Sequence, residues 1–478
     1  MPESRDLVAH ARDTRVVVVG GGVAGAVAAL ECAKVGMTVT LLEAEGDLGG
    51  ALRAADLGGV EVDALVDGFA PGGIDLAGLL VDLGLDGEVV VGEQSSIRIS
   101  GLPGRVEAAP VPADSVLGIP ANPWDAAVRR VIGWGGAWRA YVDRLRPPLT
   151  IGRERNLGAL VRTRMGDAVC DRLVAPVTRA RLGLDPHEVD ADIAAPGLNT
   201  ALTRTGSLAG AVTSLTGRPA GRATLAGGMH RIATALAERL AQFDVEVRTG
   251  VRVTGLRHHD DGWTVAASAS DEELALRADA VVLAVPEGTA RDLLDGVVRL
   301  PETIPARAAE VVVLRLKGTT AGGGRTVVAP VVGDVWRVAD VAASSPAVAA
   351  AVPEGERIVR VEIVPAEGAA TATTDETAIA RALAAASDAG GTPVAAADVR
   401  AAVRLRPAWH PSAQLDRRDR SRTAREVLHG IPSLAVTGAW LSGDGLDEVV
   451  ADAVTEADRL RSRALWGGDG APASPGAP

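Results

Sequence analysis

Three glycines near the amino terminus, Gly20, Gly22 and Gly25, have the spacing Gly-x-Gly-x-x-Gly. In such a motif the first glycine lets the chain turn tightly, and the second lets a pyrophosphate approach the backbone. The third lets a helix pack close to a strand. Glu43 follows at about the 20-residue distance from which a carboxylate can accept hydrogen bonds from a ribose diol. These residues therefore predict dinucleotide binding.

The elements that must position this site occur in the order strand, helix, strand. Val16 to Val19 is an apolar run without alternation, which indicates a buried parallel strand. Val23 to Val35 has Ala-rich helical spacing, and Gly36 is well placed to end that helix. Thr38 to Leu42 reads as a second strand with Glu43 at its carboxyl end. This order favours a dinucleotide site over a merely structural βαβ unit.

Composition narrows the class of protein. A chain of 478 residues suggests two or three domains, and a net charge of −12 argues against nucleic-acid binding. Two cysteines are too few for a disulfide framework, and no secretory signal precedes the first strand. No uncharged apolar run reaches the length of a membrane span. We therefore expect a cytoplasmic globular protein without a transmembrane segment, whose oligomeric state the sequence does not determine.

The segment from Pro123 to Pro148 carries aromatic residues interleaved with arginines. It is open to three interpretations: a surface helix with snorkelling arginines, a lid over an anionic substrate, or a patch that rests on a membrane surface. The side chains concerned are Trp124, Trp134, Trp138, Tyr141, Arg129, Arg130, Arg139, Arg144 and Arg146.

Elsewhere we expect a frayed leader over Met1 to Thr14 and a helix over Leu157 to Leu173. The His258-His259 pair reads as turn residues, so no metal site is expected.

Further motifs carry a resemblance to a known family. Gly49, Gly50 and Arg53 follow Glu43 as in FAD enzymes of the amine oxidase superfamily, where the paired glycines run along the flavin side of the cofactor. The whole order resembles the protoporphyrinogen/coproporphyrinogen oxidases, a branch of that superfamily. Other matching segments are Leu173 to Pro176, Ala226 to Met229 with Leu236, Val253, Ala284 to Pro286, and the block VTGAWLSGDGLDEVVADA, whose glycine turn and helix close over the flavin.

The resemblance implies non-covalently bound FAD that accepts hydrides from a porphyrinogen, with O2 as the final acceptor. It implies the cofactor-binding residues Gly20, Gly22, Val23, Ala24, Gly25, Glu43, Ala44, Gly49, Gly50, Arg53, Val253, Gly438, Gly443, Gly445 and Leu446. Candidate substrate residues are Phe69 by its position in the family, and Arg139, Arg179 and Arg181 because guanidinium groups suit propionates. No Ser/His/Asp or paired-carboxylate constellation is visible, and flavin chemistry requires none.

The implied fold class is α/β (α+β overall): a Rossmann-like FAD-binding domain with an inserted mixed-sheet substrate domain and a helical subdomain. The expected boundaries are 14–92, 222–299 and 431–465 for FAD binding, 93–221 for a helical substrate or lid subdomain, 300–430 for a substrate-binding sheet, and 466–478 for a disordered tail.

Several positions depart from the family's pattern, and they fall around the expected substrate cavity. They are Ala64-Leu65, Thr178 to Arg181, and Pro411-Ser412-Ala413 with Arg417. Substrate identity is therefore less well supported than the cofactor. The alternatives are another amine oxidase or desaturase-type FAD oxidoreductase, or an inactive FAD-binding paralogue. Amine oxidases usually have an aromatic cage around the substrate and a lysine near flavin N5. An amine oxidase is disfavoured here, since Tyr141 is the only tyrosine and Glu310 stands near where that lysine would be expected.

Overall fold

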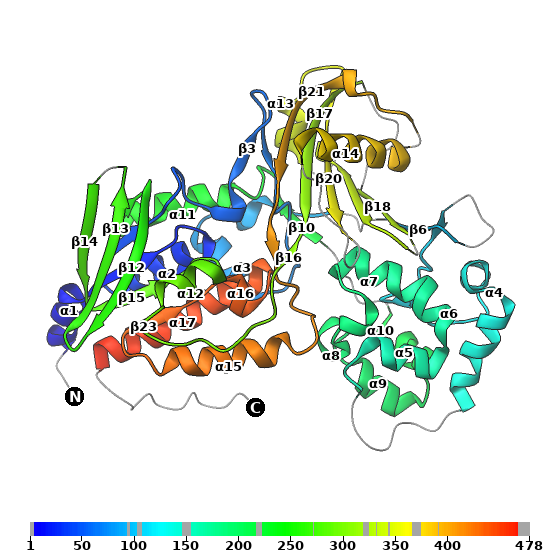
Figure 1. Cartoon of the computed structure of the whole chain (residues 1–478), viewed down its shortest axis with the longest axis horizontal. Helices are drawn as coiled ribbons and strands as arrows, with labels where there is room; N and C mark the ends of the chain where they lie inside the picture. Colours follow the sequence, from blue (N-terminus) through cyan, green and yellow to red (C-terminus); the bar gives the residue numbers. More distant parts are fainter. Residues whose placement is uncertain are drawn as a thin grey trace.

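The computed structural model describes residues 4–92, 96–102, 108–145, 154–216, 222–270, 272–318, 325–330, 332–342, 345–365, 374–390 and 392–466. Figure 1 shows three parts: a sheet flanked by helices and a β-meander, a second sheet above it, and a group of helices to one side. The tail that the sequence predicts to be disordered spans residues 466–478, and all of it beyond residue 466 lies outside the described residues.

The first sheet is parallel and is assembled from distant parts of the chain. Its strand order is β11 (Glu246–Arg248), β2 (Thr38–Leu42), β1 (Arg15–Val19), β15 (Ala280–Leu283) and β23 (Leu434–Val436). Val16 and Val18 of β1 belong to one hydrophobic core, whereas Val17 and Val19 belong to another. Both faces of the strand are therefore buried, which explains its unbroken run of valines.

Helices cover one face of this sheet, and a meander with two helices covers the other (Figure 1). The first group is α2 (Val23–Lys34), α3 (Ile74–Asp82), α11 (Arg231–Gln242) and α17 (Leu446–Trp466). The second is β12 (Val251–His259), β13 (Gly262–Ala269), β14 (Glu272–Ala278), α12 (Glu287–Leu293) and α15 (Arg417–His429). The first strand, helix and second strand expected from the sequence are confirmed.

The second sheet has seven strands and is mixed. Its order is β21 (Val399–Leu405), β17 (Glu310–Lys317), β20 (Glu356–Val364), β19 (Val335–Asp340), β18 (Arg325–Pro330), β6 (Ser96–Ser100) and β7 (Ala109–Pro110). Only β18 and β6 pair in parallel among the neighbours in this sheet. Helix α14 (Asp375–Gly390) packs on one face against Val312 and Leu314, while Val311 and Val313 face Leu57.

The helical part contains α4 (Ala126–Tyr141), α5 (Leu157–Met165), α6 (Asp167–Val169), α7 (Ala175–Leu182), α8 (Ala191–Ala194), α9 (Leu198–Thr205) and α10 (Leu208–Leu215). Short paired strands connect the parts: β3 (Ala54–Asp56) with β4 (Glu61–Asp63), β5 (Val89–Gly92) with β10 (Arg222–Leu225), β8 (Ser115–Val116) with β9 (Ile119–Pro120), and β16 (Arg307–Ala308) with β22 (Ala408–Trp409). The expected fold class is confirmed.

Some local expectations differ from the structure. Residues of the expected frayed leader form α1 (Ser4–Asp13), whose His10 ring contacts the carbonyl of Ala464 at 2.9 Å. The single helix expected over Leu157 to Leu173 is interrupted at Gly166, where φ is +92°. The domain boundaries remain predictions, but β6 joins the second sheet rather than the helical part, and α15 packs on the first sheet.

Candidate active site

The glycine motif lies between β1 and α2, and its three glycines have different steric roles. Gly20 has φ +104°, and a Cβ at Gly25 would lie 1.9 Å from the Gly20 carbonyl oxygen. These two positions therefore need glycine for the fold itself. A Cβ at Gly22 would meet nothing within 4 Å. The space in front of Gly22 is where a pyrophosphate can approach the backbone.

The amino terminus of α2 faces this space without a side-chain cap. Gly22 is the N-cap residue, and among the described residues no side chain caps this end of the helix. Val23 and Ala24 supply backbone N–H groups of that first turn, which have no partner within the helix. Uncapped N–H groups and the helix dipole together favour a phosphate.

Glu43 lies directly against the glycine loop. One carboxylate oxygen accepts the N–H of Gly21 at 2.6 Å, and the other accepts the N–H of Glu45 at 2.8 Å. Each oxygen keeps a second lone pair with which it can accept a ribose hydroxyl. The carbonyl of Glu43 accepts the N–H of Val251 at 2.8 Å, which brings β12 and its Val253 to the same edge as Ala44. This edge can hold the ribose and base of a dinucleotide.

Gly49 and Gly50 cross the first glycine loop. The N–H of Gly49 donates to the carbonyl of Gly21 at 2.8 Å, and Gly22 and Gly49 form an isolated bridge. A Cβ at Gly50 would lie 3.2 Å from the Cα of Gly22. Arg53 is half exposed and lies 3.9 Å from the carboxylate of Glu45. The two glycine segments seen in the sequence are thus adjacent in space.

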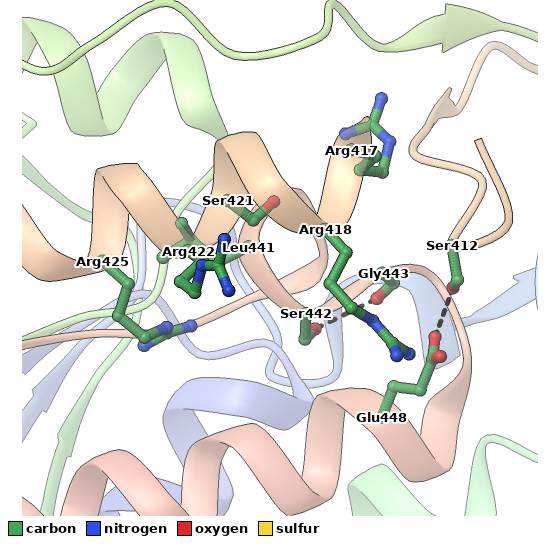
Figure 2. A pocket seen from close by; sticks show the side chains of 10 residues that line it. All are labelled: Ser412, Arg417, Arg418, Ser421, Arg422, Arg425, Leu441, Ser442, Gly443 and Glu448. Atoms are coloured by element: carbon green, nitrogen blue, oxygen red, sulfur yellow. Dashed lines mark hydrogen bonds between the residues drawn. The ribbon is translucent and has the colours of Figure 1, made fainter. Parts of the chain in front are cut away.

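The carboxy-terminal turn comes to the same edge of the first sheet. After β23 the chain passes through Gly438 (φ +128°) and α16 (Ala439–Ser442) to Gly443 (φ +105°), and α17 begins at Leu446 beyond Gly445. Because β1 and β23 belong to one parallel sheet, the helices that follow them both begin at its carboxyl edge. Figure 2 shows Ser412 donating to the Glu448 carboxylate beside this turn. The turn and the glycine motif can therefore contact one extended cofactor.

A buried carboxyl group, Asp444, lies within the turn and was not singled out from the sequence. It accepts the backbone N–H of His410, and burial raises its pKa to about 7. Burial also lowers the pKa of His410 to about 4, helped by the neighbouring Arg417. The sequence does show that Asp444 stands between the two glycines of the turn and that His410 comes 34 residues earlier. Only the fold brings these two residues together.

The structure separates the candidate substrate residues. Phe69 is only 8% exposed, lies in the core of the first sheet, and exchanges backbone hydrogen bonds with Ala223. Arg139 donates to the carbonyls of Arg164 at 2.9 Å and Thr163 at 3.0 Å, and thereby caps the carboxyl end of α5. Both have structural roles that would keep them from moving freely towards a ligand.

Arg179 and Arg181 lie on α7, where the family's pattern has a different segment. Arg179 is paired with Asp185 at 3.3 Å. Arg181 is exposed, and among the described residues no hydrogen bond or ion pair involves its side chain. The surrounding protein nevertheless lowers the pKa of Arg181 by desolvation. An exposed guanidinium without a protein partner is one that a carboxylate could reach.

The end of α7 is joined to the carboxy-terminal turn through Trp409. A Cβ at Gly183 would lie 1.9 Å from the Trp409 ring, so only glycine fits there. Trp409 precedes His410, which donates to Asp444 of the turn. Thus α7, which carries Arg181, is linked to the carboxy-terminal turn through Trp409 and His410.

Helix α4 carries the aromatic residues of the Trp/Arg segment on its surface. Trp134 and Trp138 are 69% and 62% exposed, and the guanidinium of Arg129 lies 4.3 Å from the centre of the Trp134 ring. The helix is kinked at Gly133, where φ is +74°. The helix lies on the surface with Trp134 and Trp138 exposed rather than partly buried, and the surface-helix, lid and membrane interpretations all remain predictions.

Two further findings concern the described residues. No group of three or more His, Cys, Asp or Glu side chains there is arranged to hold a metal ion. No helix among them is both long and apolar enough to cross a membrane.

Burial raises the pKa of the Cys32 thiol to about 12 and that of Cys170 to about 11. Both thiols are therefore protonated and inert at neutral pH.

The sequence profile of the family described as flavin containing amine oxidoreductase matches residues 23–461. The chain belongs to this family. A flavin is therefore the cofactor, and the protein is a flavin-dependent oxidoreductase.

Curated relatives narrow the branch. The chain is 26% identical to the coproporphyrinogen III oxidase of Propionibacterium freudenreichii subsp. freudenreichii, in an alignment that covers 96% of this chain and 92% of the relative. It is 28% identical to the coproporphyrinogen III oxidase of Mycobacterium tuberculosis (strain ATCC 25618 / H37Rv), with 64% and 67% covered. The resemblance to a diverged porphyrinogen oxidase is confirmed by these matches.

Solved structures share the fold. The crystal structure of the Exiguobacterium sp. 255-15 protein assigned as a protoporphyrinogen oxidase superposes with a TM-score of 0.79 at 20% identity, covering 94% of this chain and 99% of that chain. Putrescine oxidase bound to putrescine gives a TM-score of 0.60 at 16% identity, covering 95% and 99%. The fold alone therefore does not separate a porphyrinogen oxidase from an amine oxidase.

Proposed function

We propose that the protein binds FAD non-covalently and oxidises a porphyrinogen to the porphyrin in haem biosynthesis, with coproporphyrinogen III preferred to protoporphyrinogen IX. O2 is the proposed electron acceptor. The observation that carries the proposal is the similarity over 96% of the chain to a protein named coproporphyrinogen III oxidase. The residues whose positions bear on it are those of the glycine motif and Arg181.

The residues at the carboxyl edge of the first sheet fit FAD. The open space at Gly22 and the uncapped first turn of α2 would hold the pyrophosphate, while Glu43 would hold a ribose. The turn from Gly443 to Gly445 and the first turn of α17 would lie against the flavin ring. FAD supplies hydride acceptance there, and the chain's own residues bind it and orient the substrate.

The electron balance needs no acid–base dyad. In each of three rounds a porphyrinogen would lose two electrons, and O2 would take them up as hydrogen peroxide. The protein must then hold the substrate's carboxylates so that one ring position after another can react. Guanidinium groups bind carboxylates in a bidentate manner, and Arg181 is exposed and unpaired among the described residues.

The preference for coproporphyrinogen III follows from charge. Its four propionates offer two more carboxylates than protoporphyrinogen IX, and each can be held by a cationic side chain.

An amine oxidase activity has less support, because Glu310 is fully buried and paired with Arg404 and with Arg381 at 3.4 Å. The carboxylate of Glu310 is thus occupied within the second sheet. The main competing proposal is an inactive FAD-binding paralogue. Measured turnover of a porphyrinogen decides between the two.

We place the protein in the cytoplasm, with α4 resting on a membrane surface. Trp134 and Trp138 are exposed beside Arg129 and Arg130, and such a pairing of aromatic and cationic residues suits an anionic interface. This contact would be peripheral.

The role of Arg181 provides a direct test. In an aerobic assay with coproporphyrinogen III, Arg181→Gln should raise KM about tenfold or more, since a charged hydrogen bond is lost, and leave FAD content unchanged. The matched control is Arg204→Gln, an exposed arginine on α9. If Arg181→Gln and Arg204→Gln have the same KM as the wild type, Arg181 does not hold substrate. Hydrogen peroxide measured together with porphyrin fluorescence tests O2 as the acceptor.

A further inference from the structure

A cavity of about 270 Å³ lies between α15 and the carboxy-terminal turn (Figure 2). Four arginines of α15 line it: Arg417, Arg418, Arg422 and Arg425. Because residues three and four apart share a helix face, Arg418, Arg422 and Arg425 gather on the side of α15 that faces the turn. Arg417 points away from the turn in Figure 2 and donates to the carbonyl of Ile304 at 3.1 Å. The opposite wall includes Ser442 and Gly443.

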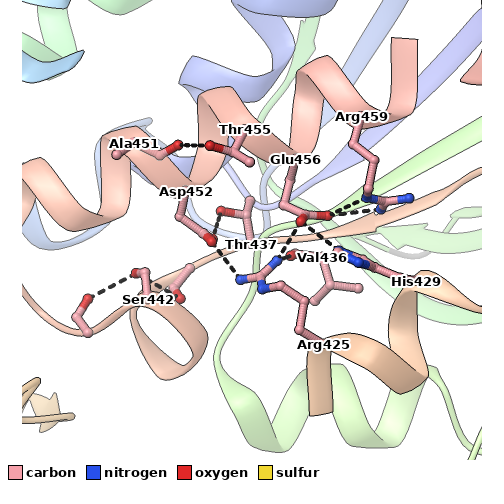
Figure 3. Close-up of polar contacts among 12 residues, drawn as sticks. Arg425, His429, Val436, Thr437, Ser442, Ala451, Asp452, Thr455, Glu456 and Arg459 are labelled. Carbon is pink, nitrogen blue, oxygen red and sulfur yellow. Dashed lines mark hydrogen bonds and ion pairs between the residues drawn. The ribbon is translucent and has the colours of Figure 1, made fainter. Parts of the chain in front are cut away.

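Positive charge in this cavity is not balanced by the protein. Arg425 is paired with Asp452 at 2.6 Å and with Glu456 at 2.9 Å, as Figure 3 shows for this polar cluster. By contrast, neither Arg417 nor Arg418 has a carboxylate within ion-pair distance among the described residues. Arg418 is exposed, and Figure 2 shows it extending towards the space beside Ser442 and Glu448.

The remaining charges do not cancel the excess. Arg422 pairs with Asp419 at 3.2 Å in an exposed position, where such a pair contributes little. Among the described residues that line the cavity, Glu448 is the only one with a carboxylate, and it accepts the Ser412 hydroxyl and the N–H of Gly445 at 3.3 Å. Those two donors hold Glu448 against the turn and leave Arg418 and Arg422 facing the space.

A hydroxyl donor completes the lining. Ser421 is only 7% exposed, lines the cavity, and has no hydrogen-bond partner among the described residues. The Ser421 hydroxyl is open to the cavity rather than enclosed by protein, so it can donate to a ligand there. Ser442 differs, since its hydroxyl already donates within the turn, to Gly443 at 3.1 Å.

We propose that this cavity binds a small oxyanion, either a phosphate or a carboxylate, through the guanidinium groups of Arg418 and Arg422 and the hydroxyl of Ser421. Planar guanidinium groups match both kinds of oxyanion, and the volume leaves room for the waters that accompany it. The helix that carries these three donors, α15, packs on the opposite face of the first sheet from α2, whose amino terminus would hold the FAD pyrophosphate.

The anion would also affect the flavin. The cavity shares Ser442 and Gly443 with the turn that would close over FAD, so an anion that fixes this turn also favours FAD retention. Such coupling is reciprocal: bound FAD should tighten anion binding by the same factor. The proposal does not depend on which substrate the enzyme oxidises.

The test titrates the FAD-loaded protein with inorganic phosphate, and separately with malonate, against sodium chloride at matched ionic strength. We expect saturable heat of binding by calorimetry and a Tm that rises with ligand as for a single site. Arg418→Gln/Arg422→Gln should weaken binding of the anion about tenfold or more. Arg420→Gln removes the same kind of charge from an exposed position on α15 outside the lining, and should leave Kd within about twofold.

The outcomes separate a site from surface screening. Saturable binding of phosphate alone, of malonate alone, or of both supports the site and identifies the oxyanion. No saturable binding, or equal weakening by Arg420→Gln, overturns it. Ser421→Ala, a smaller change, should weaken binding several-fold and covers the case in which the double variant folds poorly. An FAD release rate that phosphate leaves unchanged would contradict the coupling to the turn.

Discussion

Gly22 is a position where the needs of folding and of cofactor binding are separable. A Cβ there meets no atom within 4 Å, so Gly22→Val should fold with a wild-type circular dichroism spectrum. The valine would fill the space in front of α2, and the purified variant should therefore be colourless even when refolded with FAD. In Gly25→Val, by contrast, the Cβ lies 1.9 Å from the Gly20 carbonyl, so we expect loss of folding. A yellow Gly22→Val protein would contradict the assigned pyrophosphate position.

Asp444 makes a specific contribution to the pH dependence of stability. Its folded-state pKa is raised to about 7 by burial, whereas an unfolded aspartate ionises near pH 4. Between these values the folded state holds the extra proton, so the stability that Asp444 contributes is lost as the pH rises towards about 7. Above that pH the loss is constant.

Asp444→Asn keeps a neutral group at this position and removes that loss. Relative to the wild type, the variant should therefore gain about 1 kcal/mol or more of unfolding free energy between about pH 5 and about pH 8. Urea unfolding at the two pH values measures this difference. Asp447→Asn, three residues further along the chain in the first turn of α17, serves as the charge control. A difference between Asp444→Asn and the wild type that does not change with pH would be inconsistent with a buried neutral carboxyl group.

Among the elements, α4 has the clearest untested role. If it rests on a membrane, anionic vesicles should sediment the protein at low salt and release it at high salt, because screening weakens the attraction of the arginines. Trp134→Ala/Trp138→Ala should then lose most of the sedimented fraction. If α4 is a lid instead, the same variant should raise KM without changing vesicle binding. A variant unchanged in both assays would leave α4 as an ordinary surface helix.

The elements that the sequence predicted well are those whose signals are local. The valine run of β1, the glycine spacing before α2 and the helix after the carboxy-terminal glycine turn each depend on a few neighbouring residues. The interruption at Gly166 was missed because the apolar spacing continues on both sides of it. The helix α1 was missed because its support comes from the distant carbonyl of Ala464.

Contacts between distant parts of the chain decide which candidate residues remain free, and the sequence does not show them. Arg139 and Arg179 were reasonable carboxylate ligands by residue type, yet the first caps α5 and the second pairs with Asp185. Only Arg181 of the three is left without a partner among the described residues. Similarly, the contact of Asp444 with His410 joins residues 34 positions apart, and the neighbouring Trp409 packs against Gly183.

At the scale of the whole molecule, the carboxy-terminal turn lies at the edge of the first sheet and is joined to α7 of the helical part through His410 and Trp409. Such an arrangement serves porphyrinogen oxidation only if a porphyrinogen reduces the bound flavin. The most direct measurement is an anaerobic titration of the FAD-loaded protein with coproporphyrinogen III and, separately, with protoporphyrinogen IX. We predict that coproporphyrinogen III bleaches the flavin's visible absorbance at lower concentration, with porphyrin fluorescence rising in step. Flavin that stays oxidised with both porphyrinogens, while FAD remains bound, would contradict the proposed function.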